Sequence, residues 1–238
     1  MNDMSKYLTL FRTRLLAVVA ACLMAVVPAL AETHYKPHIN VGFHGGMTMG
    51  RMSFAPSVSQ DWLNGYTAGV HVSYSEEKLF GLIGEVNLTQ RGWKERFKDL
   101  EEPEYQRALT YVSIPVMTHI YFGPKRCKFF FNLGPELSFM IGDKITSNFD
   151  YKDPHSGTGI PHSRHCEQMY MDIQHKIDYG ITAGLGCEFW VSPRNAVYVE
   201  ARYYYGLGSI FRDSKADVFS ASRGMSLAIT AGYSFRVK

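Results

Sequence analysis

The chain has 238 residues, of which 46% are hydrophobic and 20% charged, and its formal net charge at pH 7 is +3. This length suits one or two domains. Because 25 Lys and Arg residues are nearly balanced by 22 Asp and Glu residues, the composition predicts no concentrated basic face, and no nucleic-acid partner is expected.

Residues 1–31 have the three-part layout of a cleaved secretory signal peptide. A basic leader precedes the apolar run 15–27, and "PALAE" supplies an A-x-A cleavage site at Ala29 and Ala31. The apolar run is shorter than the about 20 residues that a membrane-spanning helix needs. We therefore expect export and cleavage after Ala31. Residues 32–238 contain no linker-like stretch, which favours a single domain.

The cysteines leave one alternative open at this end of the chain. "VAAC", which ends at Cys22, resembles a lipobox, so a lipoprotein signal is the competing interpretation. Cleavage after Ala31 would leave Cys127, Cys166 and Cys187, and this odd number implies no disulfide framework.

Almost every segment after the leader alternates between apolar and polar residues with a period of two, which predicts strands rather than helices. The stretch "CKFFFNLGPELSFMIGD" shows the pattern, with phenylalanines on one parity and small or polar residues on the other. Eight strands are predicted, at residues 37–52, 64–75, 79–91, 107–122, 127–143, 171–191, 196–210 and 223–238.

The connections between these strands alternate in length. Three are tight turns, at residues 76–78, 123–126 and 192–195, and the last two contain Gly, Pro or Asn. Four are longer and polar, at residues 53–63, 92–106, 144–170 and 211–222. Short turns on one rim and long loops on the other are typical of outer-membrane barrels. The predicted fold is therefore all-β, an eight-stranded antiparallel transmembrane β-barrel with short periplasmic turns and long extracellular loops.

The two faces of the strands indicate which side meets lipid. One face carries large apolar side chains, and the other carries Gly, Ser and Thr with a few charges. Small residues suit the inside of a narrow eight-stranded cylinder. We therefore expect the apolar face to point outward, into lipid.

The inward face predicts a polar network in the lumen. Its ionisable members are Glu85, Glu136, Asp178, Glu188, Glu200 and Arg202. Buried charges must be paired or hydrogen-bonded, so a structural network that fills the lumen is the favoured interpretation, and a proton or ion path is the alternative. Because acids outnumber this one arginine, we expect His44, His71, loop lysines or water to complete the network.

Two further residue types call for a structural interpretation. Trp62, Trp93 and Trp190 fall near predicted strand ends, where interfacial aromatic residues gather in membrane barrels.

Pro115 and Pro135 fall inside predicted strands that have neighbours on both sides. Proline cannot donate to a strand ladder, so a bulge or locally broken pairing is expected at both.

The longest loop holds "HSGTGIPHSRHCE", which is rich in metal-ligand residue types. His155, His162, His165, Cys166 and Glu167 match no zinc spacing, so a polar surface loop is favoured over a metal site. Ser163 lies between two of these histidines, but adjacency in sequence is poor evidence for a catalytic triad. No catalytic residue, metal or cofactor is expected.

The order and spacing of several motifs resemble one family. These motifs are "INVGFHGGMTMG", "GYTAGVHVSY", "GLIGEVNLTQRGW", "YVSIPVMTHIYF" and "FFFNLGPELSFMIG". Together they resemble the PorT-family outer-membrane β-barrel proteins of Bacteroidetes-type bacteria, small barrels of the OmpA/OmpX kind. The last strand, "LAITAGYSFRVK", is similar to the insertion signal read by the barrel-assembly machinery, with Gly232, Tyr233 and Phe235 in alternation. The resemblance implies fold and location, and no activity.

The favoured hypothesis is a non-enzymatic outer-membrane barrel that serves envelope structure, surface interaction or a secretion apparatus. Its expected partners are outer-membrane lipid and lipopolysaccharide, the barrel-assembly machinery during insertion, and an envelope or secretion-system protein. Two alternatives remain: a barrel enzyme that acts on lipid A or phospholipid, and a soluble lipocalin-like ligand-binding barrel.

Overall fold

The computed structural model describes residues 37–75, 79–97, 103–124, 126–161, 164, 166–212 and 218–237. The predicted signal peptide, and His162, Ser163 and His165 of the longest loop, lie outside these residues. Within the described ranges, no helix is long and apolar enough to cross a membrane.

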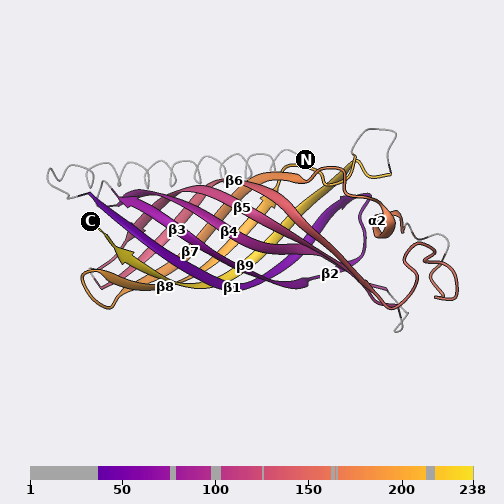
Figure 1. The fold of residues 1–238 in the computed structure, drawn as a ribbon, viewed down its shortest axis with the longest axis horizontal. Helices are drawn as coiled ribbons and strands as arrows, with labels where there is room; N and C mark the ends of the chain where they lie inside the picture. The colour runs from indigo at the N-terminus through magenta and orange to yellow at the C-terminus, as the bar shows by residue number, and fades with distance from the viewer. Residues whose placement is uncertain are drawn as a thin grey trace, which may run out of the picture.

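The described residues form one antiparallel sheet that closes on itself (Figure 1). Its strands are β1 (His38–Ala55), β2 (Gln60–Asp61), β3 (Leu63–Ser75), β4 (Phe80–Glu95), β5 (Tyr105–Phe122), β6 (Cys127–Ser147), β7 (Ile177–Trp190), β8 (Asn195–Gly206) and β9 (Ala221–Arg236). The short helix α2 (Glu167–Tyr170) lies in the connection between β6 and β7. Strand β2 has two residues, so the ring consists of the other eight strands. The predicted eight-stranded antiparallel barrel is confirmed.

The order of neighbours around the sheet is β2-β4-β3-β1-β9-β8-β7-β6-β5, and an additional β4–β5 pairing closes the ring. Figure 1 shows the strands tilted steeply against the long axis, as closure of a sheet into a barrel requires. The C-terminus lies at the end of the barrel opposite α2 (Figure 1). The long connections therefore gather at the α2 end, and the short turns at the other.

Five predicted boundaries differ from the structure by three or more residues, and β1, β4 and β6 extend beyond their predicted ends, to Ala55, Glu95 and Ser147. Strand β7 begins at Ile177 instead of residue 171, and β8 ends at Gly206 instead of residue 210. Residues 171–176 and 207–210 continue the apolar alternation in the sequence, but they belong to connections that pack over the barrel mouth. Period-two alternation does not distinguish a strand from an extended segment of such a plug.

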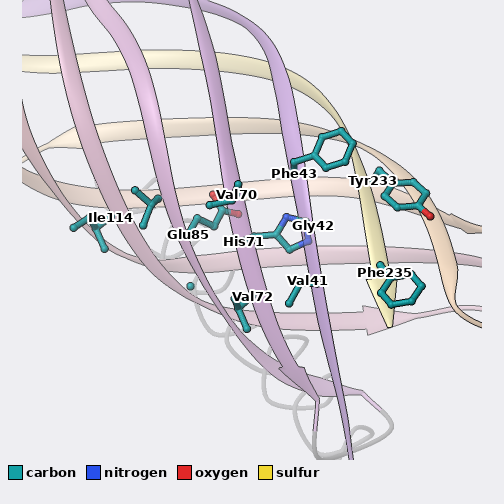
Figure 2. A pocket seen from close by; sticks show the side chains of 12 residues that line it. Val41, Gly42, Phe43, Val70, His71, Val72, Glu85, Ile114, Tyr233 and Phe235 are labelled. Atoms are coloured by element: carbon teal, nitrogen blue, oxygen red, sulfur yellow. The ribbon is translucent and has the colours of Figure 1, made fainter. Parts of the chain in front are cut away.

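Apolar side chains cover the outside of the ring. Phe43, Val70 and Leu185 are 60%, 58% and 65% exposed, whereas the residues that alternate with them are buried or partly buried. Figure 2 shows part of this outer wall, where Val41, Phe43, Val72, Tyr233 and Phe235 surround a groove of about 640 Å³. The arrangement is the reverse of a soluble protein, in which the apolar face would be hidden from the solvent.

The inside of the ring is lined by small and polar side chains. Large inward side chains lie so close to the backbone of the neighbouring strand that glycine is required at particular positions. A Cβ atom at Gly232, for example, would meet the ring and hydroxyl of Tyr198 at 2.6 Å or less. Small residues on the inward parity therefore make room for a few large side chains that reach across the barrel.

The two prolines interrupt the ladder where they were expected to do so. The paired positions of β4 and β5 leave out Ile114 and Pro115, and those of β5 and β6 leave out Gly134 and Pro135. The expectation of locally broken pairing is confirmed at both sites, because proline has no N–H to donate. A separate register shift lies between Thr110 and Tyr111.

The outward apolar face leads to a depth-dependent prediction. We expect Val70→Arg, at the middle of β3, to lower the free energy of unfolding by about 2–4 kcal/mol, because a cation near the bilayer midplane is poorly solvated. Val191→Arg, at the rim, serves as the control and should cost about 0–1 kcal/mol. Urea unfolding in lipid vesicles measures both. Equal effects of the two substitutions would contradict the outward placement of Val70.

Candidate functional site: the closed lumen

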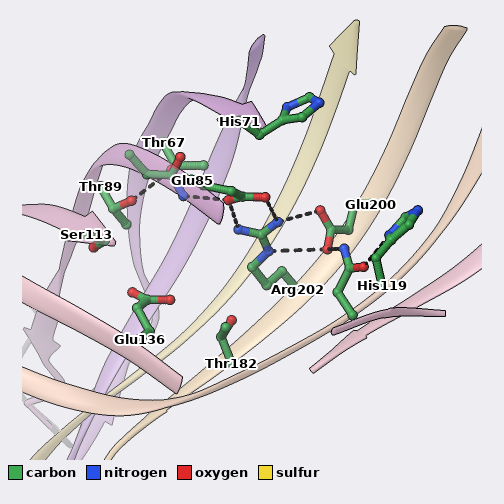
Figure 3. A network of polar contacts seen from close by, with 12 residues as sticks. Thr67, His71, Glu85, Thr89, Ser113, His119, Glu136, Thr182, Glu200 and Arg202 are labelled. Atoms are coloured by element: carbon green, nitrogen blue, oxygen red, sulfur yellow. Dashed lines mark hydrogen bonds and ion pairs between the residues drawn. The ribbon is translucent and has the colours of Figure 1, made fainter. Parts of the chain in front are cut away.

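A first ion cluster crosses the middle of the lumen around Arg202 (Figure 3). The guanidinium of Arg202, from β8, forms a bidentate ion pair with Glu85, from β4, and a second pair with Glu200 at 2.7 Å. Strands β4 and β8 lie on opposite sides of the ring, so the Arg202 side chain bridges the barrel. Glu85 and Glu200 are only 3% and 2% exposed, so both carboxylates that pair with Arg202 are buried.

Neutral side chains extend this first cluster around the wall. Asn132 donates from Nδ2 to Oε1 of Glu200 at 2.9 Å, and its Oδ1 lies 2.7 Å from Nδ1 of His119. On the other side, Asn87 donates to Glu85 at 2.8 Å. The hydroxyl of Tyr198 lies 3.3 Å from Nδ1 of His71, a contact that brings an imidazole beside the cluster. The carboxylates are therefore held by several donors each, which offsets their loss of water.

A second ion cluster lies nearer the long-loop end and centres on Arg91. Its guanidinium pairs with Glu136, lies 3.8 Å from Oδ2 of Asp178, and stacks over the ring of Tyr204 with 3.7 Å from Cζ to the centroid. Ser138 donates to Glu136 at 3.2 Å. Arg91 itself is 5% exposed, so the cation is buried among its partners.

Little space remains between the two clusters. A cavity of about 20 Å³ lies there, and its lining includes His44, Thr230 and both arginines. This volume accommodates about one water molecule. Among the described residues, the side chains of the two clusters therefore occupy most of the lumen at this level.

A third polar group closes the mouth of the barrel by tying a loop to the strands. Arg107 forms a bidentate ion pair with Asp143 at 2.9 and 2.6 Å and donates to the carbonyl of Met171 at 2.7 Å. Glu95 accepts from Arg164 at 2.8 Å and from Gln168 at 3.0 Å. The contacts with Met171, Arg164 and Gln168 join residues 64, 69 and 73 positions apart, so they fix the β6–β7 connection onto the ring.

An aromatic plug fills the space above these ion pairs. Phe54, Phe211 and Phe219 pack against one another with centroids 5.2–6.2 Å apart, and Trp93 meets Phe54 edge-on at 5.4 Å. Ile160, Cys166 and Met169, from the β6–β7 connection, belong to the same buried cluster. Burial raises the pKa of the Cys166 thiol to about 11, so this thiol is held in its neutral, unreactive form.

The predicted lumen residues are distributed over three places. Glu85, Glu200 and Arg202 meet in the first cluster, and Glu136 and Asp178 in the second. Glu188 lies apart, half-buried at the short-turn end, where it accepts from Nε1 of Trp190 at 2.8 Å.

Two arginines of the lumen were missing from the prediction. Arg91 pairs with Glu136 and Asp178, two of the predicted lumen carboxylates, and Arg107 pairs with Asp143. Both share the inward parity of their strands, as Asn87 and Ser113 do, so the alternation would have identified them. They were overlooked because they lie at the ends of their predicted strands.

The prediction that Trp93 is an interfacial aromatic residue is wrong. Trp93 is 0% exposed and packs inside the aromatic plug, while Trp62 is 47% exposed on the outer surface and Trp190 is half-buried at the opposite rim. The physical reason is the parity of the strand, because Trp93 lies at the same parity as Asn87 and Arg91, whose side chains point into the barrel. The preceding Gly92 has φ +147°, a conformation that few other residues adopt, and a Cβ there would collide with the backbone of Arg107.

The loop that carries several metal-ligand residue types lies mostly at the surface, in agreement with the prediction, and Lys152, Asp153, Ser156 and Gly157 are exposed. Cys166 is buried in the plug, and His155 lies 3.2 Å from the carbonyl of Ile160 through its Nδ1. In the part of the chain that the structure describes, no three His, Cys, Asp or Glu side chains are grouped to hold a metal ion. The sequence did not predict that Ile160, Cys166 and Met169 anchor this loop in the plug.

The last strand places the predicted insertion-signal residues on both faces. Gly232 faces the lumen beside Tyr198, whereas Phe235 is 38% exposed on the outer wall. Tyr233 is partly buried, and its hydroxyl donates to Oδ1 of Asn195 at 2.6 Å.

A closed ring of tilted antiparallel strands, apolar outside and polar inside, defines an integral β-barrel of the bacterial outer membrane. Residues 34–212 match the family model described as "Outer membrane protein beta-barrel domain". The chain belongs to this family. No curated protein matches its sequence.

Several solved structures are similar to this chain at low sequence identity. Neisserial surface protein A (NspA) is 12% identical, with 84% of this chain and 99% of that chain covered and a TM-score of 0.45. OprG from Pseudomonas aeruginosa is 8% identical, with 83% and 95% covered and a TM-score of 0.48. Ail of Yersinia pestis is 13% identical, with 83% and 99% covered and a TM-score of 0.39.

The first ion cluster gives a prediction about stability. Arg202→Met leaves Glu85 and Glu200 buried without their cation, so we expect the free energy of unfolding to fall by about 3–5 kcal/mol. Adding Glu85→Gln and Glu200→Gln to that variant should restore part of the loss, because the uncompensated charges are removed. Urea unfolding in vesicles measures both variants. If the triple variant is less stable than Arg202→Met alone, charge pairing is not what stabilises this cluster.

Proposed function

We propose that this protein is a non-conducting, non-enzymatic outer-membrane barrel that serves envelope structure and presents its long connections as an interaction surface. The observation that carries the proposal is the closure of the lumen at two levels. Two ion clusters fill the middle, with a cavity of only about 20 Å³ between them, and an aromatic plug covers the mouth. A side-chain network of this kind stabilises a barrel and leaves no aqueous path.

The plug also supports a role for the outer rim. Apolar anchors such as Met169, Phe211 and Phe219 are 0% exposed, so they hold the surrounding connections in place. Exposed side chains at this end include Tyr170 and Val218, which are 46% and 42% accessible. Rigid presentation of such residues favours contact with an external partner, since little conformational entropy is lost on binding.

The two alternatives from the sequence are less well supported. A soluble lipocalin-like barrel would place its apolar side chains inside, whereas Phe43, Val70 and Leu185 point out of the ring. An enzyme acting on lipid A or phospholipid would need its acid and base groups within reach of the membrane. Here the buried carboxylates Glu85, Glu136 and Glu200 are paired with arginines inside the ring, which favours a structural role.

The proposal includes a narrower relationship and a route of assembly. Motif order and spacing support kinship with the PorT-type barrels of Bacteroidetes-type bacteria, and with that kinship a place beside an envelope or secretion-system protein. The alternation of Gly232, Tyr233 and Phe235 in β9 supports recognition by the barrel-assembly machinery. Lipid and lipopolysaccharide would surround the outer wall.

Export is the first step of this route. We expect residues 1–31 to be removed after Ala31, because a basic leader, an apolar run and an A-x-A site precede that position. The intact mass of the protein recovered from the outer membrane should therefore correspond to a chain that begins at Glu32. A mass that shows lipid attached to Cys22 would support the lipoprotein alternative instead.

The closed lumen leads to a direct test of the proposed function. In planar bilayers, the wild-type protein should show no steady ion conductance, because the ion clusters seal the lumen. Phe211→Ala, which loosens the aromatic plug, should also fail to conduct, since the seal around Arg202 and Arg91 lies deeper. The matched variant Arg91→Ala/Arg202→Ala/Phe211→Ala removes the cations of both ion clusters and loosens the plug, and it is the one expected to leak. Steady conductance by the wild type would contradict the proposal.

Chemical analysis tests the enzymatic alternative separately. Lipid A and phospholipids from cells with and without the protein should have identical mass spectra. A loss of acyl chains that depends on the protein would favour the enzyme.

A further inference from the structure

The outer face of the ring is charged at one end only. Among the described residues of the eight ring strands, every carboxylate faces inward. The charged side chains on the outward face are all cations, and all lie near the long connections: Arg51, Lys94, Lys144 and Arg223. The wall that meets lipid therefore carries positive charge at the long-loop rim.

Two of these cations are neighbours on the sheet. Strands β1 and β9 pair antiparallel, with Arg51 opposite Met225 and Arg223 opposite Ser53. Both arginines alternate with buried residues, so both have the outward parity of their strands. Positions related by this diagonal lie about 7–8 Å apart on the same face of a sheet. Two long side chains at that spacing are able to reach one ligand.

The positive charge of this pair is not neutralised by the protein. Among the described residues, neither Arg51 nor Arg223 has an ion-pair or hydrogen-bond partner for its side chain, and Nε of Arg223 is buried without one. Asp61 is near enough to Arg51 to interact with it electrostatically, but its carboxylate accepts from Nε of Arg96 at 2.7 Å. Like charges on neighbouring strands repel each other, so an anion bound between them would stabilise this part of the sheet.

Apolar and aromatic side chains adjoin the arginines on the same outward face. Met47 and Ile229 oppose each other further down β1 and β9 and are 65% and 52% exposed. On the next strand, the hydroxyl of Tyr203 donates to Sδ of Met225 at 3.4 Å, and Trp62, before β3, is 47% exposed. Such aromatic residues gather where headgroups meet hydrocarbon. The arginines therefore lie at the upper edge of the apolar wall.

The position along the barrel identifies the leaflet that these residues meet. Long connections of outer-membrane barrels face the outside, so the rim with Arg51 and Arg223 lies at the outer leaflet. The characteristic lipid of that leaflet is lipopolysaccharide, whose lipid A anchor combines phosphate groups with several acyl chains. A ligand of this kind matches a pair of unneutralised arginines above an apolar wall.

We propose that Arg51 and Arg223 form a binding site for a phosphate group of lipid A, with its acyl chains along Met47 and Ile229. Guanidinium groups donate to phosphate oxygens in the bidentate geometry that arginine favours, and Trp62 and Tyr203 flank the headgroup. The inference rests on the proposed placement of the barrel among lipid and lipopolysaccharide, and it is independent of the closed lumen.

Native mass spectrometry of the detergent-solubilised protein tests the site. Diphosphoryl lipid A and the phosphate-free lipid A with the same acyl chains are titrated in parallel. We expect the diphosphoryl form to bind about twentyfold more tightly, because each of two cations near a membrane surface contributes about fivefold. Arg51→Gln and Arg223→Gln should each weaken its binding about fivefold. Equal binding of the two lipids would overturn the proposal.

The matched control is Lys144→Gln. Lys144 is an outward cation of the same rim, but it lies on β6, away from β1 and β9 in the ring, so its loss should leave lipid A binding unchanged. If Lys144→Gln weakens binding as much as Arg51→Gln does, the lipid responds to overall charge and the site is refuted. Gel mobility of the unheated protein shows whether each variant forms a closed barrel. If Arg223→Gln fails to insert, Arg51→Gln decides the question.

Two competitors distinguish the source of the phosphate. Phosphatidylglycerol and inorganic phosphate, each at the concentration of diphosphoryl lipid A, should leave most of the lipid A bound. Full displacement by either one would overturn the assignment to lipid A. Ion conductance by the wild type would refute the closed lumen alone, so failure of the proposed function and failure of this site are read from separate measurements.

Discussion

The hydrogen-bonding requirement of the backbone in lipid is the constraint on which the rest of this structure depends. A bilayer offers no water to an unpaired N–H or C=O, so every spanning strand needs a partner on both sides. The additional pairing of β4 with β5 meets this requirement by closing the ring. The interruptions at Pro115 and Pro135 are short, two positions each, and the ladder resumes in the same register on either side of them.

Closure of eight strands also determines what the interior can hold. Gly232 must lack a side chain for the ring of Tyr198, its paired residue on the neighbouring strand, to fit inside the barrel. Several of the large inward side chains are charged, and burial makes each of these dependent on a partner. Arg202 and Arg91 therefore each pair with two carboxylates, and the resulting clusters link strands that the sheet itself does not join.

The two ends of the barrel use their residues differently. At the mouth, Arg107 and Glu95 tie the β6–β7 connection down, and aromatic rings seal the space beneath it. At the opposite rim, Lys128 and Arg236 lie over the ring of Trp190, and Glu188 accepts a hydrogen bond from its Nε1. Charges at the mouth thus hold a connection onto the ring, whereas charges at the short-turn rim pack around one aromatic side chain.

The sequence by itself determined the strands, the lengths of their connections and the face that each side chain takes, because alternation with a period of two is a local property. It also predicted the broken pairing at both prolines, since a missing N–H is a property of the residue. Only the tertiary structure decided which charges meet. Glu85 and Arg202 are 117 positions apart and meet across the lumen, a distance that no local pattern encodes. The placement of Trp93 and of Ile160, Cys166 and Met169 in one plug likewise depends on how separate connections fold over the mouth.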